Sequence, residues 1–229
     1  MENDIVVQQP ANPAQLMLLF HGVGATPQSM QGVGNYLAKG FPNALIVSVA
    51  AAAPSDMGAG FQWFSIQGVT EDNRAGRVAD AMPAFIAAVR RWQQHSGLGY
   101  EATALIGFSQ GAIMALEAIK VENTLAGRVL SFGGRFAVLP QTDLKHTTIH
   151  LFHGKADPVM PFQLSVQAAE HLIKLGGDIT AEIEPHVGHT INEDLMEKAL
   201  DYLQSHIPKR LWEEALSSAP GKGDIHPKA

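Results

Sequence analysis

The 229-residue sequence contains no cysteine, which excludes disulfides, thiolate catalysis and cysteine-containing zinc sites. Positive charge is also scarce: 16 Lys and Arg residues stand against 22 Asp and Glu residues, a formal net charge of −6. Neither a nucleic acid nor an anionic membrane surface is therefore an expected partner. The first apolar run, residues 16–20, is too short for a signal-peptide core or a membrane span. We expect a cytoplasmic protein with no integral membrane segment.

The chain is rich in apolar residues, at 46%, and their arrangement indicates an α/β fold with a mainly parallel central sheet. Short apolar runs that end at glycine alternate with longer amphipathic stretches, as in strands joined by crossover helices. The predicted strands cover residues 5–8, 16–20, 44–49, 102–106, 128–132, 147–152 and 178–184. The predicted helices cover residues 27–39, 73–95, 109–121, 162–175, 191–206 and 209–217. They are expected on both faces of the sheet.

The domain organisation follows from the lack of repeats and of interdomain linkers. A chain of this length suits one α/β domain, which we place at residues 1–218 without a separate cap domain. Residues 219–229 are rich in Gly, Pro and charge, which predicts a disordered tail. The segment at residues 50–70 is longer than a routine connection and carries Phe61, Trp63 and Phe64. These aromatic residues either close the edge of the core or line a substrate groove.

A single serine, Ser109, stands between Gly107 and Gly111 at the junction of a predicted strand and a predicted helix. The chain must reverse direction there within about three residues, which leaves the serine on a tight turn, the nucleophile elbow. Side chains at the two glycines would collide with the neighbouring strand and helix. The start of the helix also favours developing negative charge. The alternative is an ordinary turn in which the serine only caps the helix.

A serine hydroxyl needs a base, and the base needs an acid that fixes its tautomer. Both are expected after later strands, the acid first. Asp157 follows the strand at residues 147–152, in a loop before Pro158, and His189 follows the strand at residues 178–184. His189 also precedes a helix that Thr190 and Glu193 are predicted to cap.

Other residues could take these roles. His186 is the nearest rival to His189 as the base, and the alternative acids are Asp143, Asp178 and Glu184. His153, at the end of a strand, is predicted instead to support the turn that carries Asp157. The oxyanion of an acyl-transfer intermediate needs two N–H donors. They are predicted to be Gln110, directly after the serine, and Val23, in a loop with Gly22 and Gly24 whose alternative interpretation is a plain tight turn.

Five motifs in order, FHGVGATP, FQWFSI, GFSQGAIMAL, HGKADPVMP and VGHTI, resemble the phospholipase/carboxylesterase family of α/β-hydrolases, which includes the acyl-protein thioesterases. The resemblance covers nearly the whole chain, roughly residues 4–206. It implies a serine hydrolase with the α/β-hydrolase fold and with Ser109, Asp157 and His189 as its triad. It further implies Val23 and Gln110 as oxyanion donors, hydrolysis of carboxylic esters or thioesters, and neither a metal nor an organic cofactor.

Three departures from the thioesterase branch concern the substrate. That branch usually reads HGLGDTG where this chain has HGVGATP, and it favours an aspartate where Ser65 stands. The segment SFGGRF at residues 131–136 also differs from the usual serine-glycine segment after that strand. They argue against an acyl-protein substrate, so we expect a small-molecule ester with a short to medium acyl group. A thioester or a lysophospholipid is the alternative within the family. The predicted substrate contacts, each of which could equally be core packing, are Trp63, Phe64, Met160 and Phe136. A homodimer is compatible with the sequence, which does not specify the oligomeric state.

Two hypotheses from other classes remain. In one, the fold is kept only for ligand binding and the triad is idle. In the other, a metal is bound by the HLFH and HVGH segments, residues 150–153 and 186–189. Residues three apart in a strand face opposite sides, so His150 and His153 are not expected to reach one ion.

Overall fold

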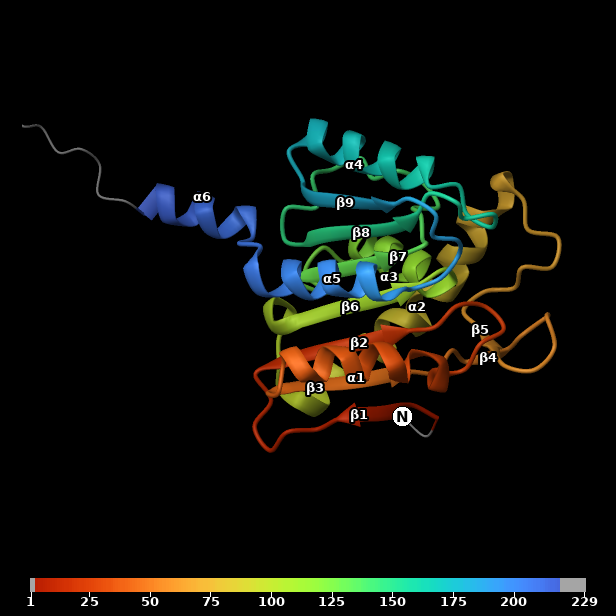
Figure 1. Cartoon of the computed structure of the whole chain (residues 1–229), viewed down its shortest axis with the longest axis horizontal. Helices are drawn as coiled ribbons and strands as arrows, with labels where there is room; N and C mark the ends of the chain where they lie inside the picture. Colours follow the sequence, from red (N-terminus) through yellow and green to blue (C-terminus); the bar gives the residue numbers. More distant parts are fainter. Residues whose placement is uncertain (1–2, 219–229) are drawn as a thin grey trace, which may run out of the picture.

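The computed structural model describes residues 3–218, and its centre is a seven-stranded sheet in the order β1-β3-β2-β6-β7-β8-β9 (Figure 1). The antiparallel edge pair joins β1 (Ile5–Gln8) to β3 (Ala44–Val49), and all other neighbours are parallel. The other strands are β2 (Gln15–Phe20), β6 (Thr103–Phe108), β7 (Arg128–Phe132), β8 (Thr148–Gly154) and β9 (Asp178–Glu184). The carboxyl ends of the parallel strands therefore share one edge of the sheet, where their loops can meet.

Helices cover both faces of the sheet, which confirms the predicted architecture. One face carries α1 (Gln31–Gly40) and α5 (Glu193–Ser205), and the other carries α2 (Glu71–Ser96), α3 (Gln110–Val121) and α4 (Gln163–Leu175). The last helix, α6 (Lys209–Ser218), projects away from the sheet (Figure 1). Short 3-10 turns are η1 (Pro27–Met30) and η2 (Tyr100–Ala102). Over residues 3–218, no helix combines the length and apolar character needed to cross a membrane.

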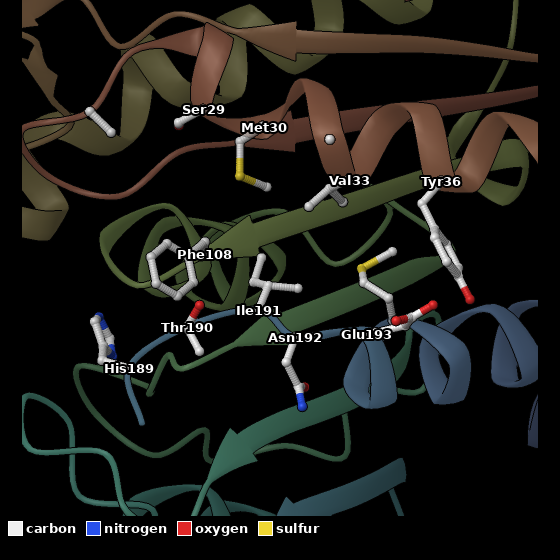
Figure 2. Close-up of a pocket in the computed structure, with 13 residues that line it drawn as sticks. Ser29, Met30, Val33, Tyr36, Phe108, His189, Thr190, Ile191, Asn192 and Glu193 are labelled. Carbon is white, nitrogen blue, oxygen red and sulfur yellow. The ribbon is translucent and has the colours of Figure 1, made fainter. Parts of the chain in front are cut away.

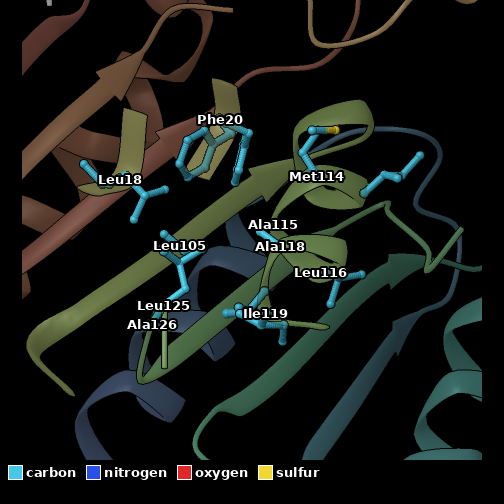
Figure 3. Close-up of a cluster of buried hydrophobic side chains, with 14 of the residues drawn as sticks. Leu18, Phe20, Leu105, Met114, Ala115, Leu116, Ala118, Ile119, Leu125 and Ala126 are labelled. Atoms are coloured by element: carbon cyan, nitrogen blue, oxygen red, sulfur yellow. The ribbon is translucent and has the colours of Figure 1, made fainter. Parts of the chain in front are cut away.

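The strands supply two cores because their side chains alternate between the faces of the sheet. In β2, Leu16, Leu18 and Phe20 pack toward α2 and α3, while Met17 and Leu19 pack toward α1 and α5. Figure 3 shows Leu18 and Phe20 with Leu105 and the apolar side chains of α3. Full burial of each such side chain contributes about 1.5–3 kcal/mol. All the residues of α3 from Gln110 to Ile119 are buried, so this helix is firmly packed against the central strands β6 and β7.

The structure differs from the sequence prediction in the connection between β3 and α2. It contains a two-stranded sheet formed by β4 (Ala53–Pro54) and β5 (Phe61–Gln62), which was not predicted because two-residue strands leave no periodicity in the sequence. The predicted helix at residues 27–39 is divided into η1 and α1. The predicted tail at residues 219–229 lies outside the described residues.

The predicted cap of α5 is wrong. The helix begins at Glu193, and the side chain of Asn192, not of Thr190, accepts a hydrogen bond from the N–H of Leu195 at 3.1 Å. Asn192 has the extended backbone of an N-cap residue, with φ −100° and ψ 176°, and asparagine is one of the preferred N-cap residues. Residues 191 and 192, which were predicted to begin this helix, therefore lie in the loop that follows His189.

A buried histidine, His150, lies in β8 on the face covered by α5. Its ring stacks on Tyr202 with the ring centroids 5.0 Å apart. Its Nδ1 lies 2.9 Å from Thr180 Oγ1, and its Nε2 lies 3.1 Å from a guanidinium nitrogen of Arg128. Because a guanidinium only donates, Nε2 is the acceptor and Nδ1 carries the proton. Burial, together with the charges of Arg128 and His206, lowers the pKa of His150 to about 3.

We expect this histidine to make the folded protein less stable as the pH is lowered. Below about pH 6.5 the unfolded chain protonates His150 whereas the native state does not, so stability is lost by up to about 1.4 kcal/mol per pH unit. The glutamine substitution His150→Gln should therefore reduce the pH dependence of the unfolding free energy between pH 6.5 and pH 4.5 by this amount. Urea unfolding at a series of pH values measures both slopes. Equal slopes in the two proteins would contradict the prediction, whatever their absolute stabilities.

Candidate active site

Ser109 sits on a strained turn between β6 and α3. It is the N-cap of α3, with φ 52° and ψ −115°, a conformation that is unfavourable for any residue other than glycine. The Ser109 N–H donates to the carbonyl of Phe132 at 2.9 Å. A Cβ at Gly107 would lie 2.5 Å from the backbone of Ala112, and one at Gly111 would lie 2.3 Å from the carbonyl oxygen of Phe20. Only glycine fits at these two positions, as the motif predicted.

The structure brings Ser109, His189 and Asp157 together in one hydrogen-bonded chain. His189 Nδ1 lies 2.6 Å from Asp157 Oδ2, and His189 Nε2 lies 2.9 Å from Ser109 Oγ. An ionised carboxylate only accepts hydrogen bonds, so Nδ1 carries the proton and Nε2 is free to accept from the serine hydroxyl. The ring of His189 packs on Phe108, with the centroids 4.9 Å apart. This is the geometry in which a histidine can remove a proton from a serine.

The carboxylate of Asp157 is almost completely buried, with 1% of its side chain exposed. Its Oδ1 accepts hydrogen bonds from the N–H groups of Val159 and Met160, both at 2.8 Å. Burial alone would raise the pKa of Asp157, but the Met160 N–H, the His189 ring and the Val159 N–H outweigh it and lower the pKa below its ordinary value. The group is therefore ionised at neutral pH and can stabilise a positive charge on His189.

His153 supports the turn that carries Asp157, as its place at the end of a strand suggested. Its Nδ1 lies 2.8 Å from Ser165 Oγ, and its Nε2 lies 2.9 Å from the carbonyl oxygen of Met160 and 3.2 Å from Asp157 Oδ2. Since a carbonyl only accepts, Nε2 is the protonated nitrogen. Burial lowers the pKa of His153, so the ring is neutral and acts through these hydrogen bonds on the position of the aspartate.

The rival residues lie elsewhere. His186 is exposed. Asp178 is the first residue of β9, at the amino ends of the parallel strands and away from Ser109, where it accepts hydrogen bonds from Thr148 and His206. Glu184 forms an ion pair with Lys198. His150 faces α5, whereas His153 faces α4, as the alternation of a strand requires. Within residues 3–218, no three His, Asp or Glu side chains are grouped in a way suited to a metal ion.

The loop after β2 carries the predicted oxyanion donor Val23. A Cβ on the preceding Gly22 would lie 3.4 Å from Ser109 Cβ, so this loop runs directly beside the serine. No hydrogen bond to the N–H of Val23 or of Gln110 is found within the described residues, and both residues line the same cavity as Ser109. Both residues that were expected to form the oxyanion hole thus border the cavity of the serine with an N–H group that can donate to a substrate.

His21 is a supporting residue that was not predicted from the sequence. It is fully buried, its Nδ1 lies 2.8 Å from the carbonyl oxygen of Gly22, and its Nε2 accepts from the N–H of Ala51 at 3.2 Å. Burial lowers the pKa of His21, which keeps the ring neutral. It ties the turn after β2 to the end of β3. Its position directly after a buried strand was the only available signal.

The aromatic segment at residues 61–64 also supports the oxyanion loop. Phe61 exchanges backbone hydrogen bonds with this loop, donating to Ala25 at 2.8 Å and accepting from Gly24 at 2.9 Å. The indole Nε1 of Trp63 donates to the carbonyl of His21 at 2.8 Å. A Cβ on Gly60, whose φ is +102°, would lie 2.3 Å from the carbonyl oxygen of Gly24. The two loops are therefore packed backbone against backbone.

The side chain of Gln110 holds the same segment in place. Its Oε1 accepts from the N–H of Trp63 at 2.8 Å, and its Nε2 donates to the carbonyl of Phe64 at 2.7 Å. From the sequence, only the backbone amide of this residue was expected to matter. The Gln110 side chain therefore connects the start of α3 to the aromatic segment. Because the Trp63 indole is hydrogen-bonded to the carbonyl of His21, this connection extends to the oxyanion loop.

Replacing Gln110 with methionine should leave two backbone groups without partners, the buried carbonyl of Phe64 and the partly buried N–H of Trp63. We expect a loss of about 1–3 kcal/mol in the free energy of unfolding for each unpaired group, and a lower kcat/KM for esters because the oxyanion loop loses support. Gln93 offers a matched control. Its buried amide donates to the Thr103 hydroxyl and to the Leu125 carbonyl, at the amino ends of the parallel strands and away from Ser109. Gln93→Met should lose stability without losing activity in the folded protein. Equal kcat/KM values in both variants would contradict the proposed role.

A cavity of about 490 Å³ opens beside Ser109; we call it the Ser109 cavity. Its apolar lining includes Phe64, Ile66, Ile113, Met160 and Leu164. Glu71 also lines it and pairs with Arg74 at 2.8 Å and with Arg135 at 2.9 Å.

Two of the predicted substrate contacts therefore line this cavity and two do not. Phe64 and Met160 do, whereas Trp63 packs between Phe20 and Phe85. Phe136, which is 4% exposed, packs in the core beneath Lys120. The motif placed these aromatic residues near the serine but could not indicate which way each ring turns.

Comparison with known proteins identifies the family. The sequence model described as Phospholipase/Carboxylesterase matches residues 1–207. The chain belongs to the phospholipase/carboxylesterase family. This confirms the resemblance seen in its motifs. The chain is 55% identical over 228 residues to Esterase YpfH of Escherichia coli (strain K12), a match that covers 98% of each chain.

More distantly similar proteins include an acyl-protein thioesterase and a second esterase. Acyl-protein thioesterase 1 of Neurospora crassa is 26% identical over 181 residues, which is 73% of each chain. Among solved structures, that of esterase PE8 has a TM-score of 0.80 at 26% identity, covering 89% of this chain and 97% of that one. The fold described here is thus shared with that esterase.

Proposed function

We propose that this protein is a serine carboxylesterase that hydrolyses small-molecule carboxylic esters. The observation that carries the proposal is the continuous hydrogen-bonded chain from Ser109 through His189 to Asp157, beside two available backbone N–H groups. Membership of a family of hydrolases supports it, as does the 55% identity to an esterase. The roles of Ser109, His189 and Asp157 as nucleophile, base and orienting acid are part of this proposal.

The mechanism follows from the geometry. Ser109 Oγ attacks the carbonyl carbon of the ester while His189 Nε2 takes the hydroxyl proton, and Asp157 stabilises the imidazolium that results. The N–H groups of Val23 and Gln110 stabilise the oxyanion. His189 then gives its proton to the oxygen of the departing alcohol, and the carbon–oxygen bond to that alcohol breaks. Water, activated by the same nitrogen, releases the acid from Ser109.

The substrate class is inferred from the Ser109 cavity. Its volume of about 490 Å³ lies within the range of small-molecule sites, and its apolar lining suits an acyl chain of short to medium length. Glu71 forms ion pairs with both Arg74 and Arg135, and the rest of the wall is predominantly apolar. We further propose that residues 1–218 act as one domain and that the protein works in the cytoplasm.

Hydrolysis of p-nitrophenyl and ethyl esters of graded acyl length by the purified protein tests the proposal, with thioesters of the same acids and lysophospholipids measured in parallel. A higher kcat/KM for esters with acyl chains of short to medium length is expected. A consistent preference for thioesters, or for lysophospholipids, would instead favour the alternatives within the family. Failure both to hydrolyse any ester and to react with a fluorophosphonate would favour a ligand-binding protein with an idle triad.

A further inference from the structure

A second hollow borders the proposed triad on the other face of the sheet. It has a volume of about 540 Å³ and lies between α1 and α5, with η1 and the loop at residues 189–192 completing its walls; we call it the His189 groove. Figure 2 shows His189 and Phe108 at one end and Tyr36 and Glu193 at the other. Nothing in the mechanism described above uses most of its length.

The groove and the Ser109 cavity share no lining residue. Ser109, Val23 and Gln110 line the cavity, whereas His189 lines the groove. The hydrogen bond of 2.9 Å between Ser109 and His189 therefore links a residue that lines one space to a residue that lines the other. An ester with its carbonyl carbon at Ser109 Oγ has room for a substituent on either side of this bond.

General-acid catalysis decides which part of the ester lies on which side. The proton that His189 Nε2 takes from the serine must reach the oxygen of the departing alcohol, and a proton donor must come within hydrogen-bonding distance of its acceptor. The alcohol part is consequently next to His189. The acyl part then lies on the side of Ser109, where its carbonyl oxygen can meet the N–H groups of Val23 and Gln110.

The lining of the groove indicates what kind of alcohol it can hold. Its apolar lining includes Met30, Val33, Phe108, Ile191 and Met196. Met30, Val33 and Met196 form its floor and are themselves largely buried. Among residues 3–218, Glu193 is the carboxylate that lines the groove, and no lysine or arginine of that range lines it. This lining suits an uncharged, apolar group, whereas a phosphate on the leaving group would lose its hydration beside mainly apolar side chains without an arginine or lysine to bind it.

We propose that the His189 groove is the leaving-group site and that it selects esters of apolar, uncharged alcohols larger than ethanol. This inference rests on the proposed esterase function. It makes phosphate-bearing leaving groups, such as those of lysophospholipids, poor substrates. In the acylation step the bond from Ser109 Oγ to the acyl carbon forms, the bond from that carbon to the alcohol oxygen breaks, and His189 protonates the alcohol, which departs through the groove.

The test compares ethyl butyrate with hexyl butyrate. Both esters form the same butyryl-enzyme and release alkyl alcohols of similar basicity, so only contacts with the leaving group distinguish their acylation. Burial of each methylene group in the groove should raise kcat/KM by up to about fourfold. We expect hexyl butyrate to be preferred on the order of tenfold or more overall. Equal values of kcat/KM for the two esters would overturn the proposal.

Gly32 provides the variant that fills the groove. It lines the groove from α1, and a Cβ built on it meets no atom within 4 Å. Gly76, an exposed glycine of α2 with equally open surroundings, lies outside both spaces and is the matched control. Gly32→Trp should lower the ratio of kcat/KM for hexyl over ethyl butyrate about tenfold. Gly76→Trp should leave that ratio unchanged.

The outcomes separate this inference from the function on which it rests. If the unmodified protein hydrolyses neither ester, the esterase proposal itself fails. If it hydrolyses both and Gly32→Trp lowers both values equally, the groove is not the leaving-group site. A measurement on the unmodified protein does not depend on any variant: added hexanol should capture the butyryl-enzyme as hexyl butyrate more efficiently than ethanol does as ethyl butyrate. Equal capture by the two alcohols would also overturn the proposal.

Discussion

Replacing Ser109 with alanine is expected to lower kcat for ester hydrolysis by roughly a millionfold, because the members of a triad act as a unit and no other group can take the acyl chain. Alanine has a Cβ like serine, so the backbone at φ 52° is as strained as before and the turn is retained. Stopped-assay kinetics with a short p-nitrophenyl ester measure the loss. Labelling by a fluorophosphonate should disappear together with the activity.

A neighbouring serine gives the control. Ser131 in β7 is 1% exposed, and within the described residues its Oγ has no hydrogen-bond partner. Ser131→Ala should therefore keep its activity and change the free energy of unfolding by no more than about 1 kcal/mol, or even raise it, since an unpaired buried hydroxyl is costly. Near-normal hydrolysis by Ser109→Ala would show that another residue is the nucleophile.

Replacing Asp157 with asparagine is expected to lower kcat by about 10⁴-fold because it forces the wrong tautomer on His189. The N–H groups of Val159 and Met160 both donate to Oδ1, so the amide oxygen must remain at that position. The amide NH₂ then faces His189 Nδ1, which becomes an acceptor. Its Nε2 must carry the proton and can no longer take one from Ser109. Steady-state kinetics give the loss in kcat.

Asp178 is a matched control for this substitution. Like Asp157 it has a hydrogen bond to a histidine, His206 at 3.0 Å, and two further donors, Thr148 and Lys209. It lies at the opposite edge of the sheet. Asp178→Asn should cost stability but leave the kcat of the folded protein unchanged. A loss of less than tenfold in Asp157→Asn would mean that the tautomer of His189 is set by another group.

The accuracy of the sequence predictions varied with the length of the element. Buried strands such as β2 and β3 were found within one residue because continuous apolar runs are long enough to have a recognisable pattern. The short strands β4 and β5 were missed because they are fixed by pairing with each other and by the bridge between Phe61 and Ala25. The start of α5 was misplaced because a cap depends on which side chain reaches the backbone, and both Thr190 and Asn192 are suitable types.

Residues that support the site were harder to find than those proposed to carry the chemistry. Ser109, Asp157 and His189 stand in short motifs whose order along the chain reflects the order of the strands. His21 and the side chain of Gln110 bind backbone atoms that are far away in the sequence. Because every residue has such backbone atoms, the partner residues carry no sequence motif that could reveal the contact. The orientation of Trp63 toward the core was likewise decided by the available space between Phe20 and Phe85.

The sequence by itself determined the α/β architecture, the family and the positions of the serine turn and its glycines, because periodicity, steric fit and motif order are local properties of a chain. Only the tertiary structure decided which side chains meet. The parallel strands bring their loops to one edge, where His189 reaches Ser109, and the two faces of the sheet leave a separate space on either side of that contact. Distances across a fold depend on how layers pack, and no single segment of the chain contains that information.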